Sequence, residues 1–306
     1  MRCSNPVRLG GYVRGVMNQT GCDPMAQSRP SLASKASTCR VMAVTSGKGG
    51  VGKTTVVTNL AVALARRGQR VIVLDADLGL ANVDVLLGLN PSYTLLHVLR
   101  GERLLTEVAV PGPAGIQIIP AATGIEELTR LSAAERLLLL EQMDTLDGSF
   151  DVLLIDTAAG ISSNVLYFNT AAHEVIVLVT PEPTALTDAY ALMKVLATRH
   201  SVRRFLVLVN QAAGEGEARR THAQLARVAE RFIGIAPEYV GYIPFDDAVR
   251  RSVREQVPVI ERAPASPVGR ALGLVADGLI GRPRDRRPTG GSQFLFRSLL
   301  SQVDAR

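Results

Sequence analysis

The sequence predicts an α/β fold in which a doubly wound, mostly parallel β-sheet is flanked by helices. Short apolar segments rich in β-branched residues recur along the chain, and each is almost uninterrupted in hydrophobicity, as expected for strands buried on both faces. Between them lie longer segments with the apolar period of amphipathic helices. Because strands alternate with helices, we expect right-handed crossovers and a parallel sheet.

The strand pattern first occurs at residues 40–46, RVMAVTS, and then recurs toward the C-terminus. The later segments are 70–77 (RVIVLDAD), 115–120 (GIQIIP), 150–157 (FDVLLIDT), 173–181 (HEVIVLVTP), 204–210 (RFLVLVN) and 239–244 (YVGYIP). Helical patterns separate the strands, and the clearest of them lie at 54–68, 132–146, 185–200 and 217–232.

We expect the 306 residues to form three regions. Residues 1–40 are rich in Ser, Gly, Arg and Pro and have no apolar period, which predicts a flexible, basic N-terminal tail. Residues 41–281 contain the alternating pattern and form one domain. Residues 282–306 combine a basic Pro/Gly/Arg linker with a short amphipathic C-terminal helix.

The net charge of +6 is unevenly placed. Residues 1–40 carry +5 and residues 282–306 carry +4, so the middle of the chain is net negative, at −3. A domain that binds nucleic acid along a broad face is more often basic itself. Nucleic acid is therefore not an expected partner.

Cysteine usage and hydropathy exclude further classes. Cys3, Cys22 and Cys39 form no CxxC motif, which argues against a disulfide framework and a cysteine-held iron–sulfur cluster. No apolar run approaches the ~20 residues that span a bilayer, and the N-terminus has no continuous apolar signal region. We expect a cytoplasmic protein.

A glycine-rich segment follows the first expected strand. Residues 47–54, GKGGVGKT, match G-x-x-x-x-G-K-[ST] after a strand and at the start of a helix, where this phosphate-binding loop belongs. Glycines let backbone N–H groups turn toward phosphate oxygens, and the helix N-terminus adds partial positive charge. Lys53 would bridge the β- and γ-phosphates, and Thr54 would offer its hydroxyl to Mg²⁺. The expected nucleotide-binding residues here are Gly47, Lys48, Gly49, Gly50, Val51, Gly52, Lys53, Thr54 and Thr55.

Three aspartates stand at the ends of two expected strands: Asp75 and Asp77 in LDAD, and Asp156 in LLID. A carboxylate at the C-terminal end of a strand faces the ligand crevice of an open sheet. One such aspartate would often only cap a helix, but three beside a phosphate loop favour a magnesium–nucleotide site. Asp156 would then hold Mg²⁺, often through water.

The nucleotide base is expected to be adenine. Guanine-binding proteins commonly carry N-K-x-D, whereas the strand at 204–210 ends at Asn210 and continues as QAAG, without the Lys and the Asp. ATP and Mg²⁺ are therefore the expected cofactors.

The unit KGGVGKTT, residues 48–55, resembles the deviant phosphate loop of the MinD/ParA ATPases, which are P-loop NTPases of the SIMIBI type. The resemblance covers nearly all of 41–260. It implies that Lys48 reaches across a dimer interface to the partner's nucleotide and that Asp77 orients the attacking water. It further implies base contacts by Asn210 and Pro244, the catalytic set Asp77, Lys48 and Lys53, and the metal-associated set Thr54, Asp156 and Asp75.

Two segments, 75–102 and 160–196, resemble the FlhG (FleN) branch of this family, which sets the number and site of flagella. The resemblance implies an ATP-dependent homodimer that acts with an FlhF-type GTPase. It also implies a flagellar switch component or a flagellar transcription activator as a further partner. Members often carry D-Q-A-x-x-L-R near the N-terminus; residues 23–29 match it only at their ends, and Pro24 disfavours helix before it.

The C-terminal segment SQFLFRSLLSQVDAR places five apolar side chains on one helical arc: Leu295, Phe296, Leu299, Leu300 and Val303. One interpretation is an interfacial helix that holds the protein on the anionic inner face of the cell membrane, helped by the arginines of the linker. The other is a helix that packs on the protein's own body or in a groove of the dimer.

Alternative functions remain open at this stage. A ParA-type DNA- or cargo-partitioning ATPase could use the basic pairs and triplet Arg203/Arg204, Arg219/Arg220 and Arg250/Arg251/Arg254, although charged helix faces are usually only solvated. A MinD-type division-site ATPase is a second alternative, and a regulatory protein that binds ATP without hydrolysing it is a third.

Overall fold

The computed structural model describes residues 39–122, 124, 130–146 and 148–283, all within one compact unit of the chain. Its first strand begins at Arg40 and its last helix ends at Gly281. The expectations for the N-terminal tail before residue 39, for the arginine linker after residue 283 and for the C-terminal helix lie outside the described residues.

The predicted fold class is confirmed: among the described residues, eight strands form one sheet in the order β3-β4-β2-β5-β1-β6-β7-β8. All neighbours pair in parallel except β3 and β4. The strands are β1 (Arg40–Ser46), β2 (Val71–Ala76), β3 (Val110–Pro111), β4 (Gln117–Ile119), β5 (Val152–Ala159), β6 (Glu174–Val179), β7 (Phe205–Ala212) and β8 (Glu238–Pro244). From β1 the chain passes to β2 and the edge strand β3, and it returns through β4 to β5, next to β1. It then builds the other half outward through β6, β7 and β8, which is a doubly wound arrangement.

Seven of these strands coincide with the predicted segments, and β3 is additional. It has two residues and contains a proline, which is tolerated because β3 lies at the edge of the sheet. β3 is a strand because it pairs antiparallel with β4. A segment of two residues is too short to show an alternation that would predict a strand from the sequence.

The helices predicted from the sequence are α1 (Lys53–Ala65), α5 (Ala133–Asp144), α7 (Pro183–His200) and α8 (Glu215–Ile233). The structure adds α2 (Val83–Leu86), α3 (Leu95–Leu99), α4 (Leu105–Val108), the short 3₁₀ turn η1 (Pro113–Gly115), α6 (Ser163–Ala171), α9 (Asp247–Arg254), α10 (Val259–Arg262) and α11 (Pro267–Gly281). Four glycines lie in α11, and because glycine disfavours helix, its helical pattern is weak in the sequence.

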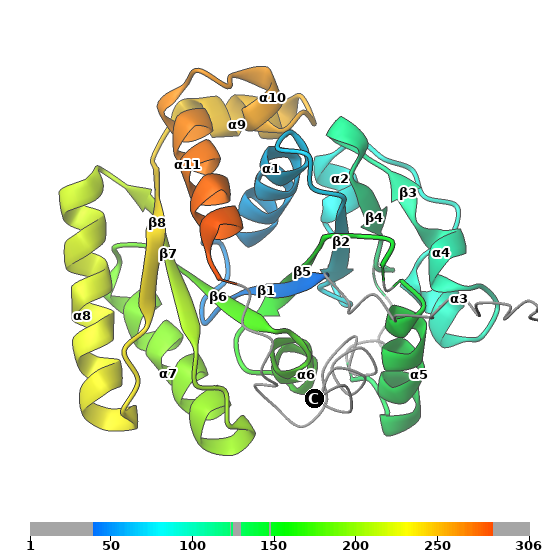
Figure 1. Ribbon diagram of the computed structural model, residues 1–306, viewed down its shortest axis with the longest axis horizontal. Coiled ribbons are helices and arrows are strands. Elements are labelled where there is room, and N and C mark those ends of the chain that lie inside the picture. Colours follow the sequence, from blue (N-terminus) through cyan, green and yellow to red (C-terminus); the bar gives the residue numbers. More distant parts are fainter. Residues whose placement is uncertain (1–38, 123, 125–129, 147, 284–306) are drawn as a thin grey trace, which may run out of the picture. The chain divides into compact units, whose positions relative to one another are not determined.

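Two helical layers cover the two faces of the sheet (Figure 1). The central strand β1 illustrates why its own sequence is apolar throughout. Every residue of β1 is buried. Met42 and Val44 pack with α1 and α11 on one face, whereas Val41 and Ala43 join the core formed with α5 and α6 on the other. Alternate side chains of a strand point to opposite faces, so a central strand of this fold needs apolar residues at both.

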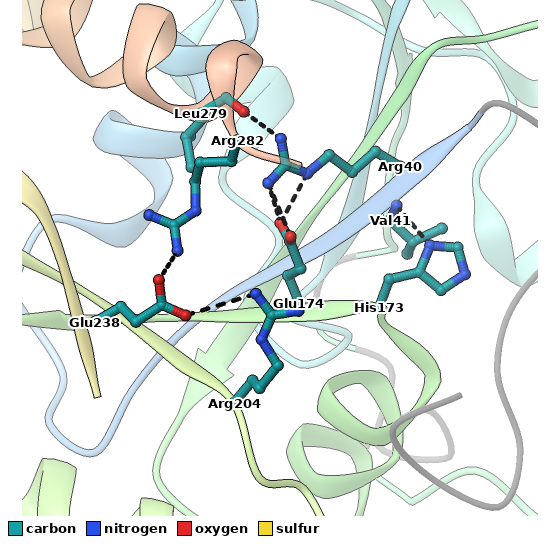
Figure 2. A network of polar contacts seen from close by, with 8 residues as sticks. All are labelled: Arg40, Val41, His173, Glu174, Arg204, Glu238, Leu279 and Arg282. Carbon is teal, nitrogen blue, oxygen red and sulfur yellow. Dashed lines mark hydrogen bonds and ion pairs between the residues drawn. The ribbon is translucent and has the colours of Figure 1, made fainter. Parts of the chain in front are cut away.

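Hydrogen bonds and ion pairs connect the end of α11 to the sheet (Figure 2). Nε of Arg40 donates to Oε2 of the buried Glu174 carboxylate at 2.8 Å, and its guanidinium also donates to the Leu279 carbonyl. Glu238 accepts from Arg282 and pairs with Arg204 at 3.5 Å. Removing one member of a buried pair such as Arg40–Glu174 leaves an uncompensated charge, which typically costs about 3–5 kcal/mol.

Candidate nucleotide-binding site

The glycine-rich loop connects the end of β1 to the start of α1, as the motif predicts, and Lys53 is the first residue of α1. Gly50 and Gly52 have φ of 77° and 89°, a region that favours glycine. Gly47 is needed for another reason. A Cβ atom built on Gly47 would lie 2.1 Å from the backbone carbonyl carbon of Asp188 in α7, so only glycine lets the loop approach α7 this closely.

Lys53 lies beneath the loop. Its Nζ donates to Oγ of Ser46 at 2.9 Å, and the Ser46 hydroxyl donates to the Lys48 carbonyl at 2.7 Å. Burial lowers the pKa of Lys53, while the charges of Asp156 and Asp77 oppose that shift. Ser46 was not among the predicted site residues, because its role depends on the fold of the loop that follows it.

Asp75 and Asp156 lie side by side, since β2 and β5 pair with these residues in register. Both side chains are 1% exposed. Burial raises the pKa of Asp75 to about 8, and the charge of Asp156 adds to the shift. Burial also raises the pKa of Asp156 to about 7, while a hydrogen bond from the Thr54 side chain opposes the change.

The two carboxylates differ in their hydrogen bonds. Asp75 accepts from the backbone N–H groups of Asp77, Asn82 and Val83 at 3.1–3.2 Å, so it fixes the segment that leads into α2. Oδ1 of Asp156 is buried and has no hydrogen-bond partner. A buried polar atom without a partner is costly, and a cation beside it would remove that cost.

These residues fit a magnesium ion that is held together with a nucleotide. Among the described residues, no group of three or more His, Cys, Asp and Glu side chains could hold a metal ion. Mg²⁺ is commonly bound by one or two protein ligands, several waters and the phosphates of its substrate. Thr54 and Asp156 are the residues that could supply those protein ligands. Asp75 lies beside Asp156 on the neighbouring strand.

Asp77 lies at the mouth of the site and is partly buried. It lines a pocket of about 820 Å³ together with Gly49, Gly50, Lys53 and Thr54 of the loop. Its Oδ1 accepts from the Leu80 backbone N–H at 3.3 Å, and burial raises its pKa. The structure therefore brings Asp77, Lys53 and the phosphate loop together around one space.

Lys48 does not line that pocket. Its Nζ lies 2.5 Å from Oε2 of Glu182, the residue before α7, and 3.2 Å from Oγ1 of Thr184. Both members of the ion pair are substantially exposed, at 38% for Lys48 and 58% for Glu182. Within a single chain, the two lysines of the loop therefore face different surroundings, and the role of Lys48 in a dimer stays a prediction.

Asn210 and Pro244, predicted from the family resemblance to contact the base, line one pocket of about 170 Å³ beside Gly52 and Thr55. Nδ2 of Asn210 donates to the Val51 carbonyl at 2.7 Å, so this side chain also fixes the phosphate loop. A Cβ on Gly52 would lie 2.7 Å from that same Nδ2. The pocket is otherwise largely apolar, and its lining includes residues not predicted from the sequence, among them Phe245, Val249, Arg250 and Leu272.

A phosphate loop at the carboxyl edge of a parallel sheet, with buried carboxylates beneath it and an apolar pocket beside it, defines a P-loop nucleotide-binding protein. A family model described as "AAA domain" matches residues 39–206. The antiactivator FleN of Pseudomonas aeruginosa is 46% identical over 85% of this chain and 93% of its own. The chain belongs to the MinD/ParA family of ATPases.

Two further comparisons agree with this assignment. The flagellum site-determining protein YlxH of Helicobacter pylori is 34% identical over 86% of this chain and 90% of its own. The septum site-determining protein MinD of Pyrococcus horikoshii, solved in complex with Mg-ADP, superposes with a TM-score of 0.68 at 27% identity, over 79% of this chain and 96% of its own. No helix among the described residues is long and apolar enough to cross a membrane.

Proposed function

We propose that this protein is a magnesium-dependent ATPase that switches between a monomer and an ATP-bound dimer and regulates the number and placement of flagella, as an FlhG (FleN) type regulator. The observation that carries the proposal is the convergence of Lys53, Thr54, Asp77 and Asp156 on the phosphate loop in a chain so similar to FleN. The solved MinD with Mg-ADP supports the nucleotide and the metal as ligands.

Each residue has a role that its position supports. The loop from Gly47 to Gly52 would cradle the phosphates through its N–H groups, and Lys53 would neutralise the β- and γ-phosphates. Thr54 and Asp156 would hold Mg²⁺, and Asp75 would stabilise Asp156 and the segment toward α2. Mg²⁺ held by these residues would neutralise negative charge on the phosphates. Asn210 and Pro244 would contact the adenine from the apolar pocket.

Hydrolysis would depend on Asp77. The carboxylate lies in the same pocket as Lys53 and is not tied to another side chain by any hydrogen bond found among the described residues. It can therefore accept a hydrogen bond from a water molecule and hold it in line with the terminal phosphate. We expect slow turnover that a partner protein stimulates.

Lys48 would act from the neighbouring subunit. Lys48 can leave its surface ion pair with Glu182 at little energetic cost, since exposed pairs contribute about 0–1 kcal/mol to stability. In a dimer formed face to face over the two nucleotides, Lys48 of each chain would reach the other chain's phosphates. The dimer would thereby exist only while ATP is bound.

The flagellar role follows from FleN and YlxH, whose names specify an antiactivator and a flagellum site-determining protein. The proposed partners are an FlhF-type GTPase and either a flagellar transcription activator or a flagellar switch component. Similarity to MinD is lower, at 32% identity for the protein from Synechocystis, so a division-site role is the less favoured alternative. DNA partitioning is also less favoured.

The proposal is tested by size-exclusion chromatography and ATPase assays with ATP, with ADP and without nucleotide. We expect a monomer without nucleotide and with ADP, a dimer with ATP, and Mg²⁺-dependent hydrolysis that is absent in Lys53→Ala. A wild-type protein that binds no adenine nucleotide, or stays monomeric with saturating ATP, would contradict the proposal. Deletion of the gene in a flagellated host should alter flagellum number or position.

Peripheral membrane attachment through residues 282–306 is the remaining part of the proposal. Two helices on an ATP-bound dimer would bind anionic bilayers more tightly than one, by ~10²–10⁴-fold when both engage together. Co-sedimentation with anionic liposomes should therefore require ATP and be lost in Leu299→Glu. If Leu299→Glu sediments like wild type, packing of the helix on the protein's own body becomes the better account.

A further inference from the structure

We propose that Arg254, the last residue of α9, contacts the terminal phosphate of ATP bound to its own chain and so makes the site prefer ATP to ADP. The inference deepens the proposed function and rests on the pocket beside the phosphate loop being the nucleotide site. No feature of the local sequence singles Arg254 out, since it is one of three arginines on a short helix far along the chain from the loop.

Arg254 lines the pocket that contains Gly49, Gly50 and Lys53. Among the described residues that line this pocket, Lys53 and Arg254 are the cationic ones and Asp77 is the acidic one. The two cations differ in depth: Lys53 is nearly buried, whereas Arg254 is exposed at the rim. A ligand that extends from the loop toward solvent would therefore meet Lys53 first and Arg254 at its outer end.

Arg254 is available for such a ligand. In the described part of the chain, no hydrogen bond or ion pair engages its guanidinium, whereas the nearby Arg262 is paired with Glu255 at 2.5 Å and Arg67 with Asp277 at 2.5 Å. A free guanidinium beside a phosphate site is significant, because its planar fork can donate two hydrogen bonds to a phosphate group.

The end of α9 is held in place on the side of the pocket formed by α2. Nε2 of Gln256 donates to the Val85 carbonyl of α2 at 2.6 Å. Gln256 adopts a φ of 54°, and its Oε1 would lie 3.2 Å from a Cβ on Gly88. The chain thus turns sharply two residues after Arg254 and is tied to α2, which keeps Arg254 at the pocket rim.

This placement explains why the contact would distinguish the two nucleotides. ATP carries one more phosphate than ADP, and that group lies farthest from the base. Gly52 and Thr55 line both pockets. The base pocket extends from them to Asn210 and Pro244, whereas the pocket of Arg254 extends to Asp77. Arg254 would therefore reach the phosphate that ADP lacks and leave the shared part of the ligand untouched.

Arg251 offers a matched control. It lies on the same exposed face of α9, one turn earlier, and carries the same charge, but it does not line the pocket. A general electrostatic effect of α9 on an anionic ligand would be the same for both arginines. A direct contact would be specific to Arg254.

The test is equilibrium binding of ATP and of ADP, each with Mg²⁺, to full-length wild type, Arg254→Ala, Arg254→Lys and Arg251→Ala. We expect Arg254→Ala to lose on the order of 10-fold or more in ATP affinity, as for one charge-assisted hydrogen bond, with ADP affinity changed less than about 2-fold. Arg254→Lys should recover part of the loss, and Arg251→Ala should match wild type.

Equal losses for ATP and ADP, no loss in Arg254→Ala, or the same loss in Arg251→Ala would each overturn the assignment. Repeating the comparison in a Lys48→Ala background, in which no dimer is expected, decides which chain provides the contact. If the effect of Arg254→Ala then disappears, the arginine acts on the partner's nucleotide. A wild type that binds neither nucleotide would instead refute the proposed function.

Discussion

Nζ of Lys48 lies 2.5 Å from Oε2 of Glu182, although the two residues are 134 positions apart in the chain. The contact joins the outer limb of the phosphate loop to the start of α7. Because both side chains are substantially exposed, the pair contributes little to stability. In the single chain, Lys48 therefore lies at the surface beside Glu182 and outside the pocket that contains Lys53.

Replacing Lys48 by alanine should therefore separate nucleotide binding from dimerisation. We expect Lys48→Ala to change the free energy of unfolding by less than about 1 kcal/mol and to bind ATP as a monomer nearly as wild type does. The ATP-dependent dimer should be absent by light scattering. Lys53→Ala is the companion variant, and it should bind no nucleotide. A Lys48→Ala protein that still dimerises with ATP would show that Lys48 has no role across the interface.

The role of Asp77 can be tested by Asp77→Ala. If this carboxylate orients water, hydrolysis should fall by roughly 10²–10⁴-fold, while ATP binding persists and the dimer accumulates. Asp84→Ala is a suitable control, because Asp84 also lies in the segment after β2 but does not line the pocket. Turnover in Asp77→Ala close to that of wild type would assign the catalytic role to another group.

The close approach of the phosphate loop to α7 predicts that two glycines respond differently to alanine. In Gly47→Ala, the new methyl would overlap the Asp188 backbone, so the loop or α7 must move, at a cost of about 1–3 kcal/mol. A Cβ on Gly49 meets no atom within 4 Å, and Gly49→Ala should change stability by less than about 0.5 kcal/mol. Thermal melts of the two variants measure the difference. Similar melting temperatures would contradict the loop geometry described above.

The buried carboxylates make the stability of the nucleotide-free protein depend on pH. The pKa of Asp156 is about 7 in the folded chain and about 3.9 in an unfolded chain, so the folded state binds this proton more tightly. The stability that Asp156 contributes is therefore fully present below pH ~4 and is lost as the pH rises through the folded-state pKa of about 7.

We accordingly expect the melting temperature of the nucleotide-free wild type to fall between about pH 5 and pH 8, with most of the loss below the folded-state pKa of about 7. Each kcal/mol corresponds to roughly 2–4 °C for a domain of this size. Asp156→Asn, which cannot ionise, should show a smaller fall across the same range. If the variant loses as much as wild type, other groups cause the pH dependence.

Much of the fold and of the site is determined by local sequence. The apolar runs identify seven strands because a strand buried on both faces leaves a continuous pattern. The glycine–lysine motif specifies the loop because nearly all of its chemistry lies within eight consecutive residues. Asp75 and Asp156 were predictable because each ends an apolar run, and the parallel sheet then brings such ends to one edge.

Contacts between distant segments were decided only by the tertiary structure. Lys48 contacts Glu182, and Asn210 donates a hydrogen bond to Val51, 159 positions away in the chain. Arg254 lines the pocket two residues before Gln256, which bonds to α2. None of these contacts produces a periodic pattern or a motif in the sequence. Each depends on which strands are neighbours in the order β3-β4-β2-β5-β1-β6-β7-β8 and on how closely the helices pack against those strands. The sequence by itself therefore determined what kind of ligand the protein holds, and the packing of elements far apart in the chain decided which side chains surround that ligand.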